Sequence, residues 1–208
     1  MKVNYLLALI IVVLLVGFNV YIYRQSEVGH IIRNRILQLY ERDSVKTSGY
    51  KIEREIRSYE LENNGKRLSP LLEVFDTDGN KRLLSQIIGS DKLILRYSEL
   101  NCNTCVNKQL DILNSYVDSI GIDNIVLLTN YDNHIYMKQF KKVAGIKFSI
   151  FNVGTELNEL IPDIERPYFF IIETNMRINN MYVPQIDEKK VTESYIHRIK
   201  KYYFVDYF

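Results

Sequence analysis

Apolar positions are continuous near the N-terminus of the chain and alternate with polar positions over the rest of it. Residues 5–23 are apolar except for Asn19. These nineteen residues would span about 28 Å as a helix, close to the roughly 30 Å of bilayer hydrocarbon, with Tyr5 and Tyr23 at the two interfaces. The pattern therefore predicts one transmembrane helix within residues 1–24.

A cleaved signal peptide is the alternative interpretation of this segment. No small-x-small cleavage site follows the apolar run, where residues 17–21 are mostly bulky, so an uncleaved anchor is favoured. Arg24, Arg33 and Arg35 follow the run and only Lys2 precedes it, so the flanking charges alone slightly favour a cytoplasmic domain. Long domains cross the membrane despite such charges, and a cysteine pair suits an oxidising compartment. We therefore expect the domain outside the membrane.

The stretch between the predicted anchor and the globular domain has two parts. Residues 27–42 carry apolar residues at helical spacing, which predicts a membrane-proximal helix. It is either a solvated helix or a short dimerising coiled coil, although barely two heptads are present. Residues 43–70 are polar and include a turn signal at Asn63, Asn64 and Gly65. Residues 25–70 are thus predicted to be a membrane-proximal helix followed by a connector.

Short apolar runs alternate with amphipathic stretches over residues 71–208, which predicts one α/β domain. It opens with a strand–turn–strand pattern whose turn contains Asp78 and Gly79. The elements expected after this hairpin are a strand at 92–97, a helix from the cysteines to Gly121, a strand at 124–128, a helix at 134–143, a strand at 147–153, a proline-led strand at 167–172, its hairpin partner at 181–183 and a helix at 188–204.

Composition narrows the class of protein. The 208 residues are 47% hydrophobic, which is enough for one domain of ordinary size with an extension. A net charge of +2, evenly scattered, argues against nucleic-acid binding. His30, His134 and His197 are dispersed and give no zinc-ligand spacing with the cysteines. We therefore expect neither a metal site nor a nucleic-acid partner.

The only cysteines are Cys102 and Cys105, which stand between a predicted strand and a predicted helix. A helix N-terminus stabilises a thiolate, and a second thiol within one turn can resolve a mixed disulfide. A structural disulfide is the alternative, but a four-residue loop removes only about 2 kcal/mol of unfolded-state freedom. The spacing therefore predicts a redox-active pair.

The order of elements, the CxxC motif after a buried strand and the Arg166-Pro167 pair that opens a later strand give a resemblance. Over residues 71–204 the chain resembles the membrane-anchored thioredoxin-like proteins of the TlpA and redoxin group. The resemblance implies a thioredoxin-like fold, with a central mixed sheet flanked by helices and an N-terminal β-hairpin. It also implies that Cys102 is the nucleophile, that Cys105 resolves the mixed disulfide, and that Arg166 and Pro167 contact the substrate. Proteins of this family hold this proline in cis, but a proline that only starts a strand is the alternative, and the cis state of Pro167 stays open.

Several residues depart from that family pattern. Asn101 replaces an aromatic residue, Arg96 replaces a buried acid or amide, and Lys108 replaces a helix carboxylate. Glu99 is the nearest acid and is either a proton relay or an exposed loop residue. If Arg96 and Lys108 lay near the sulfurs, they would favour the thiolate and a more oxidising couple. The direction of electron flow, the partner protein and the oligomeric state therefore stay open.

The sequence thus predicts a thiol-disulfide oxidoreductase in a bacterial inner membrane that exchanges disulfides with protein partners on the periplasmic or outer side. No dissociable cofactor is expected. The alternative is a non-catalytic thioredoxin-like binding or scaffold domain with a structural or incidental cysteine pair. A peroxide-reducing enzyme of this fold would carry Thr or Ser where Glu99 stands, and a copper-delivery protein would separate its cysteines by three residues.

Overall fold

The computed structural model describes most of the chain, which divides into two compact units, Met1–Glu55 and Ile56–Phe208. The ranges described are 2–98, 101, 103–131, 133–154, 156–185 and 188–205. Within them, side chains are not described at 2–16, 19–20, 22, 25–32, 40–41, 44–45 and 103.

Helix α1 (Lys2–Asn63) makes up the first unit and contributes its last two turns to the second. The prediction of a polar connector is therefore wrong for residues 43–63. The Glu, Lys and Arg residues of that stretch are good helix formers, and Ser58 donates a 2.8 Å hydrogen bond to Glu62 one turn further on. Among the residues that the structure describes, no helix is both long and apolar enough to cross a membrane.

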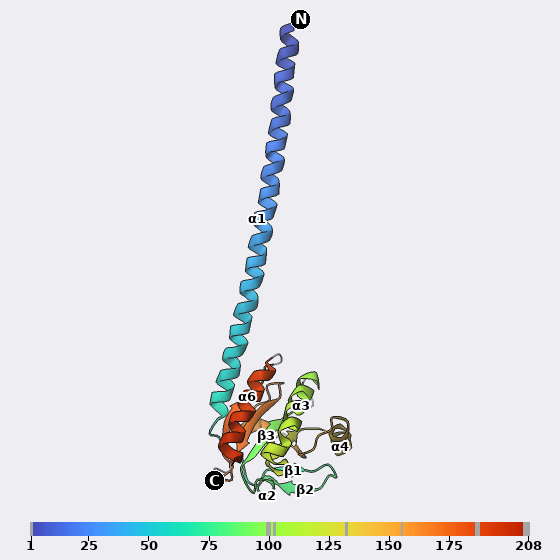
Figure 1. The fold of residues 1–208 in the computed structure, drawn as a ribbon, viewed down its shortest axis with the longest axis vertical. Coiled ribbons are helices and arrows are strands. Elements are labelled where there is room, and N and C mark those ends of the chain that lie inside the picture. Colours follow the sequence, from blue (N-terminus) through green and yellow to red (C-terminus); the bar gives the residue numbers. More distant parts are fainter. Residues whose placement is uncertain are drawn as a thin grey trace. The chain divides into compact units, whose positions relative to one another are not determined.

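The second unit is organised around one mixed sheet (Figure 1), whose seven described strands follow the order β2-β1-β5-β4-β3-β6-β7. The neighbours β3, β4 and β5 run parallel, whereas β1, β2, β6 and β7 each pair antiparallel with their neighbours. The strands are β1 (Glu73–Phe75), β2 (Lys81–Leu83), β3 (Lys92–Arg96), β4 (Ile125–Thr129), β5 (Ser149–Val153), β6 (Tyr168–Ile172) and β7 (Ile178–Tyr182).

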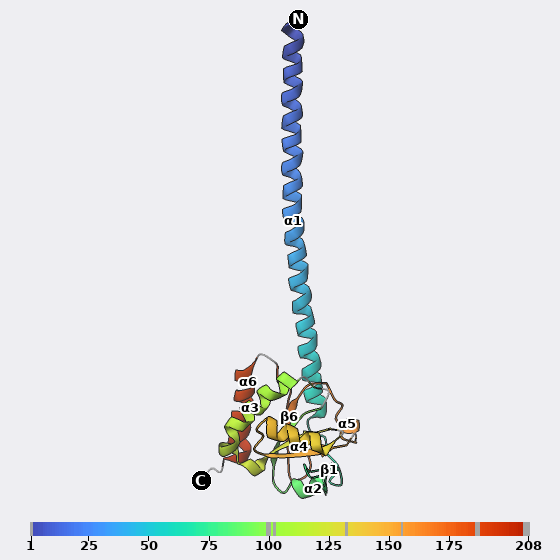
Figure 2. The ribbon, with the colours of Figure 1, turned by 90° about the vertical axis from the view of Figure 1, so that its right-hand side faces the viewer.

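Helices cover both faces of the sheet. They are α2 (Leu84–Ile87), α3 (Asn103–Ile120), α4 (His134–Val143), α5 (Glu156–Leu160) and α6 (Lys189–Ile199), with a short 3-10 turn (Ile122–Asn124) and a π-helical turn (Lys200–Phe204). Residues of α3, α4 and α6 pack on one side, which we call the first face. Residues of α2, α5 and the end of α1 pack on the other, the second face. Figure 2 shows α3 and α6 on one side of β6 and α5 on the other.

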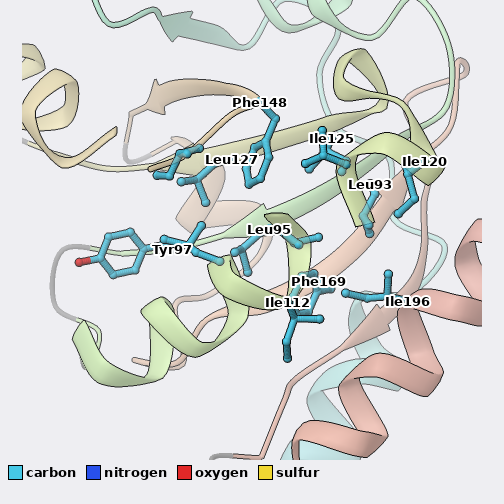
Figure 3. Packing of buried hydrophobic residues seen from close by; sticks show 14 of the residues in the cluster. Leu93, Leu95, Tyr97, Ile112, Ile120, Ile125, Leu127, Phe148, Phe169 and Ile196 are labelled. Carbon is cyan, nitrogen blue, oxygen red and sulfur yellow. The ribbon is translucent and has the colours of Figure 1, made fainter. Parts of the chain in front are cut away.

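Each face carries its own hydrophobic cluster. Because side chains alternate along a strand, Leu93 and Leu95 of β3 enter the first cluster and Ile94 enters the second. In the first cluster, Phe169 and Ile196 meet the β3 leucines (Figure 3). The five residues of β3 are all buried, as are those of β4 and β6, so the sheet is covered on both faces at its centre.

The second unit begins at Ile56 rather than at residue 71, because the segment after α1 pairs with β7. The Gly65 amide donates to Ile178 O at 2.7 Å, and the Ile178 amide donates to Lys66 O at 2.8 Å. Leu68 continues this pairing through a 3.0 Å bond to Met176 O. This segment therefore covers the outer edge of β7, which would otherwise be exposed.

The mixed sheet flanked by helices, with its N-terminal hairpin, confirms the α/β part of the predicted fold class, whereas the predicted transmembrane helix is not confirmed. The short helices α2 and α5 were not predicted, because four or five residues carry little periodic signal. Strand β7 also begins three residues earlier than expected. Its polar residues Asn179 and Asn180 resemble a turn, and Asn180 has a positive φ of 53°.

Candidate functional site

Helix α3 carries Cys105 in its first turn, just beyond the carboxyl end of the central strand β3. Its apolar residues Val106, Leu110 and Leu113 are buried on the first face, which fixes the orientation of the helix. Cys105 is half-buried, and the first turn of α3 contains no acidic residue. The sequence places Cys102 immediately before α3, but Cys102 lies outside the described residues. The structure therefore positions one of the two predicted sulfurs.

Ser98 and Asn101, between β3 and the cysteines, are hydrogen-bonded to each other. The Asn101 amide donates to Ser98 O at 2.8 Å, and the Ser98 amide donates to Asn101 Oδ1 at 3.1 Å. Both residues are buried, and Asn101 Nδ2 has no hydrogen-bond partner among the described residues. Asparagine often forms such bonds because its side chain can bond to nearby backbone amides. Asn101 therefore has a structural role where the family pattern has an aromatic residue.

An aromatic cluster lies at the carboxyl end of β3 on the first face. Tyr97 contacts Phe140 of α4 with ring centroids 5.5 Å apart and Tyr131 with centroids 6.0 Å apart. The Tyr131 and Phe140 rings are 5.7 Å apart, so all three rings touch. Tyr97 also donates its amide to Leu128 O at 2.9 Å, which extends the β3–β4 pairing by one residue. The cluster fixes the carboxyl end of β3, from which the cysteine segment departs.

Arg96, at the same end of β3, is buried on the second face. Its guanidinium donates to Tyr97 O at 2.5 Å, to Leu128 O at 3.3 Å and to Asn158 Oδ1 at 3.4 Å. Among the described residues it forms no salt bridge. Burial lowers the pKa of Arg96, and the nearby Tyr168 and Asp163 oppose that shift. The guanidinium thus lies on the face opposite α3, and Lys108 of α3 is exposed.

Two tyrosines lie next to Arg96. Tyr168 pairs with Arg96 across β6 and β3, and its buried hydroxyl has no hydrogen-bond partner among the described residues. Tyr59, from the end of α1, packs edge-on against Tyr168 with ring centroids 5.6 Å apart. The Tyr59 hydroxyl donates to Pro162 O at 2.8 Å. Burial raises the pKa of Tyr59, so its hydroxyl remains protonated and can donate at neutral pH.

The loop before β6 brings Arg166 and Pro167 to the same end of the sheet as the start of α3. Pro167 is buried and Arg166 is half-buried. The peptide bonds of the described residues include no cis bond, so the bond before Pro167 is trans, which answers a question that the sequence left open. The chain turns at Glu165, whose φ is 56° and whose amide donates to Asp163 Oδ1 at 2.8 Å. This turn leads the chain into Arg166 and Pro167.

The structure thus brings Cys105 and Pro167 to one end of the sheet, because β6 runs antiparallel to β3. Glu99, the predicted proton relay, lies outside the described residues. Sequence reasoning missed Tyr59 and Asn158, which contact the site region from distant parts of the chain. No local pattern could have found them, since each contact spans at least 62 residues of sequence.

The sheet order, the N-terminal hairpin and the helix that follows the central strand define a thioredoxin-like fold. No protein-family model matches the sequence, and no curated protein matches it. Solved structures, in contrast, match about two thirds of the chain. PrxQ from Xylella fastidiosa, solved as a cysteine-to-serine mutant, is 15% identical over 67% of this chain and 96% of its own, with a TM-score of 0.52.

Two further structures extend the likeness. Peroxidoxin BcpB from Mycobacterium tuberculosis is 12% identical over 66% of this chain and 97% of its own, with a TM-score of 0.51. The thioredoxin domain of a thiol-disulfide oxidoreductase from Bacteroides vulgatus is 12% identical over 65% of this chain and 96% of its own, with a TM-score of 0.50. At these identities the comparisons show the thioredoxin-like fold alone.

Proposed function

We propose that this protein is a thiol-disulfide oxidoreductase that acts on protein partners through Cys102 and Cys105. The observation that carries the proposal is the position of Cys105, half-buried in the first turn of α3 at the carboxyl end of the central strand. The sequence adds a second cysteine three residues earlier. In a thioredoxin-like sheet, this place combines a helix N-terminus with an accessible edge, which suits a reactive thiolate.

The exchange proceeds in two steps. The Cys102 thiolate attacks one sulfur of a partner disulfide, which forms a mixed disulfide and releases one partner thiolate. The Cys105 thiolate then attacks Cys102 Sγ, forms the Cys102–Cys105 disulfide and releases the second partner thiolate. Two electrons and two protons pass from the pair to the partner. The reverse sequence, in which the pair takes two electrons from a partner dithiol, restores the reduced protein.

Arg166 and Pro167 are the proposed contact for the partner chain. Pro167 lacks an amide donor and interrupts regular pairing at the start of β6, which leaves backbone of the preceding loop open to an extended polypeptide. Arg166, which is half-buried, would favour acidic or polar partner segments. Glu99 stays a candidate proton relay on the grounds of its position three residues before Cys102.

We also propose that residues 5–23 anchor the protein in a bacterial inner membrane, with the redox domain on the periplasmic or outer side. Support comes from the sequence, in which these residues are apolar except for Asn19. In intact spheroplasts, a thiol reagent that cannot cross the membrane should then label the reduced cysteines. Labelling that requires lysis would place the domain in the cytosol.

Trapping variants test the chemistry. Cys105→Ser should accumulate mixed disulfides with partner proteins through Cys102, because the resolving thiol is gone. Cys102→Ser is the matched control and should accumulate none. Equal trapping by both variants would contradict the assigned roles. Identification of the trapped proteins would also show in which direction the couple works.

The competing function is a binding or scaffold domain with an inert cysteine pair. A structural disulfide has a reduction potential below about −300 mV, whereas exchange-active couples lie above it. Equilibration of the full-length protein with glutathione or dithiothreitol buffers measures the potential. A reduction potential below about −300 mV, together with a Cys102 that reacts no faster than an ordinary thiol, would contradict the proposed enzyme function.

A further inference from the structure

The loop that leads into β6 is hydrogen-bonded by side chains from the end of α1 and from the segment just after it. The Tyr59 hydroxyl donates to Pro162 O at 2.8 Å, a contact between residues 103 positions apart. Lys66 Nζ, just beyond α1, donates to Leu160 O at 2.8 Å and to Asn63 Oδ1 at 2.8 Å. Two carbonyls of this connection are therefore bound by side chains from a segment that precedes the whole sheet.

Each of these hydrogen bonds supplies a donor to a backbone carbonyl for which the described residues of the loop itself supply none. Leu160 O is the last carbonyl of α5, and the carbonyls of a final helical turn have no partner within the helix. A lysine ammonium near a helix C-terminus is also favourable electrostatically. Pro162 O lies two residues further on, in a stretch without regular structure. The bonds thus define the start and the middle of the loop.

The far end of the loop is fixed by the sheet. Tyr168 pairs with Arg96 of β3, and Pro167 directly before it is buried. Tyr59 strengthens this end as well, because its ring packs against Tyr168. Only residues 163–166 remain between the Pro162 contact and the buried Pro167 that precedes β6. This is the stretch that contains Arg166 and the left-handed turn at Glu165.

We propose that Tyr59 and Lys66 are positioning residues that hold residues 163–166 in the conformation that pairs with a polypeptide substrate. The proposal rests on the proposed oxidoreductase function and names a second part of the chain that this function needs. Both residues act on backbone carbonyls, at Pro162 and at the end of α5. Their effect is therefore expected on the binding of a substrate that lies along the loop, and not on the thiol chemistry.

The test compares a large and a small disulfide substrate. Full-length Tyr59→Phe in detergent keeps the ring contact with Tyr168 and loses the bond to Pro162 O. For insulin, whose chains must lie along the loop, we expect the KM to rise about threefold to tenfold with a similar kcat, as for one lost hydrogen bond. For 5,5′-dithiobis(2-nitrobenzoic acid), which needs no loop, the rate should stay within about twofold of wild type. Lys66→Met should shift the same KM in the same direction.

Tyr195→Phe is the matched control. The Tyr195 hydroxyl donates to Asn180 O at 2.7 Å, so the variant loses the same kind of bond on the first face of the sheet. We expect its insulin KM to equal that of wild type. Amide hydrogen exchange at residues 163–166 gives a readout besides activity, and it should speed up in Tyr59→Phe but not in Tyr195→Phe.

The outcomes separate the two proposals. An active wild type whose insulin KM and loop exchange are unchanged by Tyr59→Phe overturns the positioning role alone. Equal losses with both substrates also overturn it, because they indicate a general structural defect. A wild-type protein that reacts with neither substrate overturns the oxidoreductase function. In that case hydrogen exchange still tests the contact, because unchanged exchange in Tyr59→Phe would show that Tyr59 does not hold the loop.

Discussion

The two faces of the central sheet are built differently. The first face is filled by apolar side chains from α3, α4 and α6, and its buried Tyr195 hydroxyl donates to Asn180 O. The second face is covered by shorter elements and buries the Arg96 guanidinium together with a Tyr168 hydroxyl that has no partner among the described residues. Buried polar atoms without a partner among the described residues also occur on α3, at Gln109 Oε1 and Asn114 Oδ1. We therefore infer that the desolvated guanidinium, and not unpaired polar atoms as such, distinguishes the second face from the first.

Removal of a side chain from the first face should have the largest effect on folding. Leu110 of α3 is fully buried, so Leu110→Ala should lower the free energy of unfolding by about 2–5 kcal/mol through lost burial and the cavity left behind. Urea unfolding of the full-length protein measures it. Leu61→Ala is the matched control, since Leu61 is 76% exposed on α1, and should change stability by less than about 0.5 kcal/mol. Similar losses in both variants would contradict this account of the first face.

The first face was also the more predictable one. Helix α4 occupies residues 134–143 as expected, because Asn133 caps its start by accepting the Ile135 amide at 2.7 Å and Gly145 follows its end with a φ of 60°. These signals are local and visible in the sequence. The second face depends on α5 and on the segment after α1, whose contacts join residues that lie far apart in the chain. Local patterns carry no information about such contacts.

Some features of the candidate site could likewise be predicted from the sequence, and others could not. The place of Cys105 at the start of a helix after a buried strand follows from the pattern around it. The trans bond before Pro167 and the positive φ of Glu165 do not, because no local sequence signal marks either of them. The position of the Arg96 guanidinium on the second face could have been derived from strand alternation, since Leu95 and Tyr97 face α3. Its partner Asn158 could not.

Arg96→Met tests whether the second face needs its buried charge. The change removes a guanidinium that is desolvated and forms no salt bridge with the described residues, and it keeps most of the side-chain volume. It also leaves Tyr97 O without that donor. We expect these effects to offset each other, so that the free energy of unfolding stays within about 1 kcal/mol of wild type.

Two further variants help to interpret the stability of Arg96→Met. Arg96→Ala should destabilise the protein by about 2 kcal/mol or more, because it leaves a cavity among buried residues. Lys92→Met is the matched control on the same strand and face, where the Lys92 ammonium donates to Ser90 Oγ at 2.8 Å. A loss above about 3 kcal/mol for Arg96→Met alone would show that the guanidinium's hydrogen bonds are essential to this face, as for a broken buried network.

The smallest predicted effect concerns the attachment of α1 to the sheet and depends on pH. Glu60 accepts the Val183 amide at 2.8 Å, and burial raises its pKa above the ordinary value of 4.5, although that hydrogen bond and Arg57 oppose the shift. Between pH 4.5 and the raised pKa, the unfolded chain has already released this proton, whereas the folded protein still holds it. The stabilisation from Glu60 is therefore fully present below pH 4.5 and is lost as pH rises through the raised pKa. Glu60→Gln should remove that fall while it keeps an acceptor for the Val183 amide.

Asp76 in the N-terminal hairpin provides a comparison of opposite sign. Burial raises its pKa, but hydrogen bonds from Asn80 and Asp78 outweigh that effect and the net shift is downward. Its contribution to stability is therefore present above the ordinary pKa of 3.8 and is lost as pH falls through the lowered value. Urea unfolding across acidic and neutral pH should show Glu60→Gln gaining on wild type as pH rises and Asp76→Asn losing. Parallel pH dependences of stability for the two variants would contradict this account. They would mean that neither the burial of Glu60 nor its hydrogen bond with the Val183 amide affects the stability of the second unit.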